Sequence, residues 1–180
     1  MDAGPRIETD RLILRAWTAA DRAPLAAMLA DPEVMRDYGG PLSRADSDAK
    51  LDRYQTAVER LGYGRLAVTD RAGDFLGYVG VMPISEQHRA AGEGVEIGWR
   101  LVRSAWGRGF ATEAARAALD HGFVEHGFAE VLAYTAPDNH RSLAVMARVG
   151  LVRQPERDFV YDADGVRFTA VVFAARRPAP

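Results

Sequence analysis

The sequence predicts a single mixed α/β domain. The chain has 180 residues, a length typical of one domain, and segments with strand periodicity alternate with segments of helical periodicity. Two apolar strands, residues 95–102 and 131–135, flank an alanine-rich helix at about 107–125. We expect these strands to be parallel neighbours in the sheet, joined by the helix in a right-handed crossover.

The other elements follow from periodicity and capping residues. Thr18 and Asp21 form a capping box that begins the first helix. Ser43 begins a second helix that runs to about Gly62, and Gly150 ends the last helix. The predicted strands cover residues 11–17, 65–69, 75–84, 95–102, 131–135, 152–161 and 166–175.

The composition excludes several classes of function. The formal net charge is −2, which gives no overall attraction to nucleic acid or to an anionic membrane. The chain has no cysteine, which removes thiolate nucleophiles and cysteine-ligated metal sites. The polar N-terminus lacks the apolar core of a signal peptide, and no run approaches the roughly 18 apolar residues of a membrane span. We therefore expect a cytoplasmic protein without a nucleic-acid, membrane or metal partner.

A glycine-rich loop, residues 106–111, precedes the alanine-rich helix. Gly107 and Gly109 allow a tight turn, and the first amides of the helix are free to bind an anion. Arg103 and Arg108 are placed to add charge-assisted hydrogen bonds to phosphate oxygens. The alternative is a strand-to-helix turn that needs glycine for its backbone alone.

Two common nucleotide-binding motifs do not fit this loop. No Gly-Lys-Ser/Thr follows it, and Thr112 stands where a dinucleotide fingerprint has its third glycine. A second polar group, Asn139-His140-Arg141-Ser142, begins the next predicted helix. Together, the loop and this group indicate a site for a long cofactor that carries phosphate.

The segment Trp106–Ala114 resembles the pyrophosphate-binding loop of the GNAT superfamily of N-acetyltransferases, in its RimJ/RimL-like branch. Further segments resemble that branch in the expected order: Glu8–Arg15, Val95–Trp99, Asn139-x-x-Ser142 and Val149–Leu151. The similarity covers residues 7–175, which we interpret as one N-acetyltransferase domain with a short tail at either end. It implies a sheet of about seven strands with a V-shaped split between strands 4 and 5, the strands at 95–102 and 131–135.

The resemblance implies that acetyl-CoA lies in this split. The backbone near Leu101 and Val102 would pair with the pantetheine arm, and Asn139 would hydrogen-bond to it. The glycine-rich loop would hold the diphosphate. The full expected set of cofactor-binding residues is Leu101, Val102, Arg103, Arg108, Gly109, Phe110, Ala111, Thr112, Asn139 and Ser142.

Direct acetyl transfer to an amine needs a base for the amine proton. Glu96 is the candidate, on the strand face that also carries Gly98, a residue that leaves space for a ligand. The alternative is a solvent-facing glutamate paired with Arg100. The oxyanion also needs a donor, which a backbone amide near Leu101 would supply.

Ser142 is the candidate donor to the leaving thiolate. It lies three residues after Asn139 and therefore on the same helix face. The alternative is a hydroxyl that bonds to the local backbone at a helix start. Many members of the superfamily have a tyrosine seven residues after the asparagine, where this chain has Met146.

The acceptor is expected to contact Trp17, residues 31–40 and residues 159–164, which combine aromatic rings with carboxylates. Such a mixture suits a small cationic amine or a peptide N-terminus, and it also suits any exposed loop. Two functions fit the sequence: an N-acetyltransferase that transfers acetyl directly within a ternary complex, and a non-catalytic acyl-CoA-binding module. A homodimer paired through a terminal strand is compatible with either.

Overall fold

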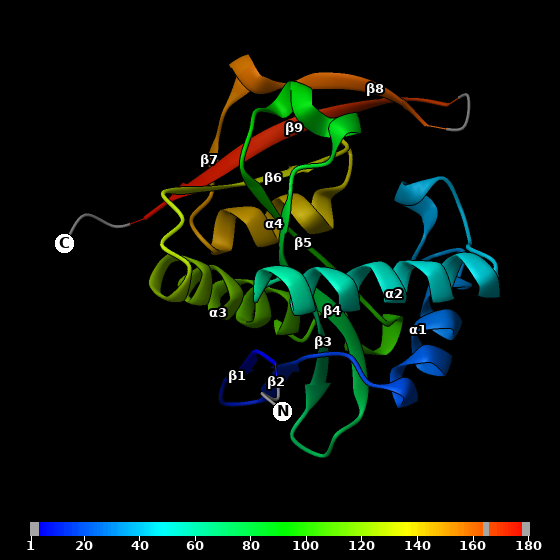
Figure 1. The fold of residues 1–180 in the computed structure, drawn as a ribbon. Helices are drawn as coiled ribbons and strands as arrows, with labels where there is room; N and C mark the ends of the chain where they lie inside the picture. Colours follow the sequence, from blue (N-terminus) through cyan, green and yellow to red (C-terminus); the bar gives the residue numbers. More distant parts are fainter. Residues whose placement is uncertain (1–3, 164–165, 178–180) are drawn as a thin grey trace.

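The computed structural model describes residues 4–163 and 166–177. Its sheet has the strand order β1-β2-β3-β4-β5-β6-β9-β7, with β8 paired to β9 (Figure 1). The strands are β1 (Arg6–Glu8), β2 (Leu12–Arg15), β3 (Arg65–Asp70), β4 (Phe75–Pro83), β5 (Val95–Leu101), β6 (Glu130–Thr135), β7 (Val152–Arg153), β8 (Phe159–Ala163) and β9 (Val166–Arg176). The helices are α1 (Arg22–Leu29), α2 (Arg44–Leu61), α3 (Phe110–Glu125) and α4 (His140–Arg148), with short 3-10 turns η1 (Ala19–Asp21), η2 (Arg36–Tyr38), η3 (Glu86–Ala91), η4 (Arg103–Ala105) and η5 (Pro155–Arg157).

The topology confirms the predicted mixed α/β class. β5 and β6 pair in parallel, and α3 connects them as the expected crossover. The other pairs among the described strands are antiparallel.

Local sequence explains where the first two helices begin. The Asp21 carboxylate accepts a hydrogen bond from the Thr18 amide at 2.8 Å, as the predicted capping box requires, and α1 follows the turn η1. The Ser43 hydroxyl accepts from the Asp46 amide at 3.1 Å and begins α2. That helix ends at Gly62, whose φ of +77° lies in the left-handed region.

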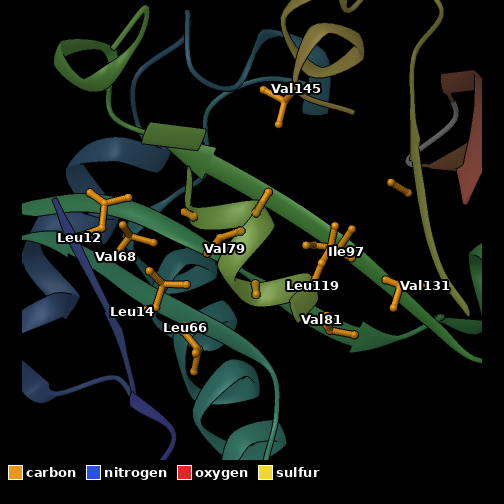
Figure 2. Packing of buried hydrophobic residues seen from close by; sticks show 14 of the residues in the cluster. Leu12, Leu14, Leu66, Val68, Val79, Val81, Ile97, Leu119, Val131 and Val145 are labelled. Atoms are coloured by element: carbon orange, nitrogen blue, oxygen red, sulfur yellow. The ribbon is translucent and has the colours of Figure 1, made fainter. Parts of the chain in front are cut away.

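Helices cover both faces of the central strands. α3 and α4 pack on one face, where Leu14, Val68, Val79 and Ile97 belong to the same buried cluster as Leu119 of α3 (Figure 2). α1 and α2 pack on the other face of β3 and β4. Side chains that alternate along β5 therefore face two different surroundings. None of the helices in the described part of the chain is long and apolar enough to span a membrane.

The sheet has nine strands rather than about seven. β1 is an additional strand, and the strand predicted at 152–161 is divided by η5 into β7 and β8. Pro155 begins η5 and has no amide to donate to a strand partner. Asp158 accepts the Val172 amide at 3.0 Å, so a side chain replaces the backbone ladder there. Part of the predicted hairpin turn, residues 164–165, lies outside the described residues.

Candidate active site

The centre of the candidate site is the point where β5 and β6 separate. The two strands share one register pair, Glu96 with Leu132, and they diverge towards their carboxyl ends. The Val102 amide donates to the Leu76 carbonyl of β4 at 2.9 Å. Because backbone groups alternate in direction along a strand, the amides of Trp99 and Leu101 face the gap beside β6. This gap is the V-shaped split that the sequence predicted.

The glycine-rich loop lies at the open end of the split. Gly107 and Gly109 have φ values of +72° and +77°, which other residues rarely adopt. Gly109 is the N-terminal cap, so α3 begins at Phe110 rather than at 107. The amides of residues 110–112 have no acceptor within the helix, and the positive end of its dipole lies there. A helix N-terminus of this kind is able to bind an anion such as a phosphate group.

Arginine side chains surround the cradle. Arg108 lies with its guanidinium 4.5 Å from the Phe110 ring centroid. Arg11, which the sequence analysis did not select, donates to the Arg108 carbonyl at 2.9 Å and pairs with Glu113 at 2.5 Å. Arg103 is largely exposed and lies 3.8 Å from Asp31. Arg11 therefore ties the loop to the first turn of α3, with its charge balanced by Glu113.

Asn139 caps α4 on the opposite side of the split. Its Oδ1 accepts the Ser142 amide at 3.2 Å, and its Nδ2 donates to Thr135 at 3.0 Å and to Asp37 at 2.5 Å. The Ser142 hydroxyl makes no hydrogen bond within the described chain, so the expected alternative of local backbone bonding is not observed. Met146 is buried in the core.

The connection between α1 and α2, residues 30–43, reaches across the open end of the split. Besides the Asp37–Asn139 bond, Glu33 pairs with Arg141 at 3.2 Å. The Arg141 guanidinium lies 3.9 Å from the centroid of Trp106 in the glycine-rich loop. These contacts join the α1–α2 connection, α4 and the loop over the split.

Glu96 lies at the apex of the split and is paired with Arg65 of β3, not with Arg100. The Arg65 Nη2 to Glu96 Oε1 distance is 2.5 Å, and the Glu96 side chain is 13% exposed. Burial alone would lower the pKa of Arg65, but the Glu96 carboxylate, together with Tyr54 and Tyr78, raises that pKa. A Cβ at Gly98 would lie 2.6 Å from Arg65 Nη2, so the space above Gly98 holds this guanidinium rather than a ligand.

An aromatic group lies beside Glu96 on the β6 side. The Tyr134 hydroxyl is 3.1 Å from Nδ1 of His88, and the His88 ring packs against Tyr161. Burial lowers the pKa of His88, although the Glu96 carboxylate acts in the opposite direction. Burial also raises the pKa of Tyr134, and Glu96 adds to that shift. Both side chains are therefore neutral near pH 7.

Two further cations lie on the same face of the sheet. Lys50 of α2 is 7% exposed and donates to the Tyr38 hydroxyl at 3.0 Å. The Arg100 guanidinium lies 5.1 Å from the Tyr38 ring centroid and 3.3 Å from Asp37. Burial alone would raise the pKa of Tyr78, but Lys50 and Arg100, together with Tyr54 and Arg65, lower that pKa to about 8.

Sequence reasoning missed the roles of Arg65, Lys50 and Tyr78. One signal was available: Lys50 occupies the helix face that also carries Leu51 and Tyr54, so a lysine falls in an apolar stripe. Trp17 was expected near the acceptor, but it is buried in the core with its indole donating to the Arg65 carbonyl at 2.6 Å.

Comparison with known proteins agrees with this geometry. The family model "Acetyltransferase (GNAT) domain" matches residues 11–152. The uncharacterized protein YkkB of Bacillus subtilis is 35% identical over 155 residues, covering 84% of this chain and 87% of that protein. An FsC-acetyl coenzyme A-N(2)-transacetylase of Aspergillus fumigatus is 31% identical over 157 residues, covering 83% of this chain and 66% of the relative.

Solved structures give the same result. The crystal structure of an acetyltransferase from Agrobacterium tumefaciens has a TM-score of 0.80 and 25% identity, covering 96% of this chain and 94% of the other. The GNAT fold uses acetyl-CoA as its acetyl donor. A split that opens on a helix N-terminus, together with these matches, shows that the chain belongs to the GNAT family of acetyltransferases.

Proposed function

We propose that this acetyltransferase acts on a primary amine by direct transfer from acetyl-CoA in a ternary complex. The observation that supports this most is the divergence of β5 and β6 directly onto the free amides of α3. We assign the domain to residues 7–175 and to the RimJ/RimL-like branch, which the order of the matching segments supports.

We assign cofactor binding to three parts of the chain: the glycine-rich loop, the end of β5 and the start of α4. Amides of residues 109–112, with Arg103 and Arg108, would hold the diphosphate. The split-facing amide of Leu101, with the backbone at Val102, would bind the pantetheine arm or the acetyl carbonyl oxygen. The chemistry that the bound cofactor supplies is a thioester-activated acetyl group. Arg11, beside the loop, would fix the loop conformation through its bond to the Arg108 carbonyl.

Asn139 and Ser142 would act from α4. The Asn139 amide group would donate to the pantetheine arm once it leaves Asp37, its partner at 2.5 Å. The Ser142 hydroxyl, which has no intramolecular partner in the described chain, would donate to the thiolate sulfur. A buried Met146 lies where many relatives place a tyrosine, so the serine hydroxyl is the donor available on this helix.

Glu96 would receive the amine proton. Arg65 occupies Oε1, which leaves Oε2 to accept a hydrogen bond from the amine or from an intervening water. The buried arginine also fixes the orientation of the carboxylate at the apex of the split.

The test is Glu96→Gln, assayed by thiol release with an acceptor amine and by calorimetric titration of acetyl-CoA. We expect kcat/KM to fall by about 100-fold or more, the usual contribution of a general base, while acetyl-CoA affinity stays within about twofold. Glu130→Gln is the matched control. Glu130 begins β6 and pairs with Arg157, so this change removes a paired carboxylate without altering the Glu96–Arg65 pair. Unchanged turnover in Glu96→Gln would exclude Glu96 as the base. Tight cofactor binding without transfer to any amine would favour the acyl-CoA-binding module instead.

A further inference from the structure

Buried positive charges outnumber buried carboxylates on the acceptor side of the split. Lys50 is 7% exposed and Arg65 is 8% exposed, and the Arg100 side chain is 14% exposed. Glu96 is the buried carboxylate among them, and it is engaged by Arg65. The one other carboxylate within reach in the described chain, Asp37, is 36% exposed and also binds Asn139. Lys50 and Arg100 therefore have less negative charge beside them than buried cations ordinarily need for neutralisation.

The hydrogen bonds of these two cations are also incomplete. Arg100 Nε is buried and has no hydrogen-bond partner within the described chain. The Lys50 ammonium donates to the Tyr38 hydroxyl, and no described carboxylate pairs with it. An ammonium has three donors, so at least part of its capacity is unused.

We propose that Lys50 and Arg100 bind a carboxylate of the acetyl acceptor, so that the substrate is a primary amine that also carries an acid. This inference rests on the proposed function, because it assigns the acceptor half of the same site. Arg100 lies four residues after Glu96 on the same strand face, about 13 Å away between Cα atoms at 3.3 Å per residue. A substrate that reaches both residues must therefore carry its amine and its carboxylate several bonds apart.

Tyr38 lies where such an acid would approach. Its ring is 4.4 Å from the Lys50 ammonium and 5.1 Å from the Arg100 guanidinium, and the residue is 48% exposed. Gly39 and Gly40 follow it with φ values of +88° and +111°, and a Cβ added to either glycine would meet no atom within 4 Å. The Tyr38 ring therefore covers the two cations, and the two glycines that follow it allow the segment to turn away from them. The lowered pKa of Tyr78 agrees with a positive potential at this place.

The carboxylates near the split are not arranged for a cationic acceptor. Asp158 pairs with Arg153, and Asp37 is shared between Arg100 and Asn139. These two pairings favour an acceptor that brings its own carboxylate over one that is only cationic. Asp164 lies outside the described residues.

The experiment uses a ladder of acceptors from glycine to 6-aminohexanoate, each compared with the alkylamine of the same length. Turnover is measured by thiol release, and binding to the CoA-saturated protein is measured by calorimetry. We expect the amino acids longer than glycine to exceed their alkylamines by about tenfold or more in kcat/KM or in affinity, as a partly buried charge pair would give.

Lys50→Met removes the charge and keeps an apolar stem, and it should bring that ratio close to one. Lys50→Arg, which keeps the charge, should retain most of it. Arg53→Met is the matched control, because Arg53 is an exposed cation of the same helix, 5.6 Å from the Tyr54 ring, and its removal should leave the ratio unchanged.

Alkylamines that equal or exceed the amino acids would overturn the proposal, and so would a failure of both series to bind the CoA-saturated protein. A ratio that survives Lys50→Met in a folded variant would overturn the assignment of Lys50. Failure of the proposed function has a different signature: either acetyl-CoA does not bind to the wild-type protein, or it binds and no acceptor of either series releases thiol.

Discussion

Gly109 gives the most direct test of the cofactor site, through the substitution Gly109→Glu. Its φ of +77° lies where an L-residue costs about 1–2 kcal/mol. An added Cβ would meet Arg11 Nη2 at 3.5 Å, an ordinary contact, so strain rather than a clash sets the loss of stability. For a domain of this size, the melting temperature should fall by roughly 2–8 °C.

The new carboxylate would stand at the start of α3, where the diphosphate is expected. Two unit charges about 4 Å apart repel by about 1 kcal/mol in water and by about 4 kcal/mol at an effective dielectric constant of 20. Two negative charges on the diphosphate therefore give at least about 2 kcal/mol. We use this lower bound because Arg11 offsets part of the repulsion. The expected loss of acetyl-CoA affinity is about 30-fold or more.

The assay is calorimetric titration of acetyl-CoA at fixed salt, with Gly73→Glu as the control. Gly73 has a φ of +94° and no atom within 4 Å of its Cβ position, so the control carries the same charge and a similar strain in the turn between β3 and β4, outside the loop that begins α3. The control should lose stability and keep its affinity. Affinity of Gly109→Glu within about threefold of the wild type would refute the assignment of the loop.

Two other predictions concern the charges around the split. Tyr78 should titrate with a pKa of about 8, and Lys50→Met should raise that pKa because it removes a neighbouring cation. Ultraviolet titration of the phenolate, with Tyr78→Phe to identify the step, checks both, and a lowered pKa in Lys50→Met would contradict the reasoning. Glu33→Gln should tighten acetyl-CoA binding, because it removes a negative charge paired with Arg141 at the open end of the split. Exposed pairs of this kind are worth about 0–1 kcal/mol, so the gain in affinity should be at most about fivefold. Glu86→Gln, in an exposed pair on η3, is its control, and weaker binding in Glu33→Gln alone would count against this account.

Much of the fold was predictable because it depends on local rules. The crossover from β5 through α3 to β6 follows from strand and helix periodicity and from the fixed hand of such connections. The start of α2 at Ser43 follows from its capping bond. The break between β7 and β8 did have a local signal, because residues 153–158 show no apolar alternation and include Pro155. The Asp158 side chain that replaces the ladder has its partner, the Val172 amide, on the separate strand β9.

The sequence by itself determined the family, the place of the anion cradle and the strand that carries Glu96. Each of these is encoded within short stretches of consecutive residues, so chain connectivity alone brings its parts together. Only the tertiary structure decided what surrounds Glu96 and Arg100. Arg65 reaches Glu96 from β3 and Lys50 arrives from α2, so their partners are set by strand register and helix packing between segments far apart in the chain. Charge pairing over such separations leaves no local pattern, which is why the partners of Glu96 and Arg100 are evident only in three dimensions.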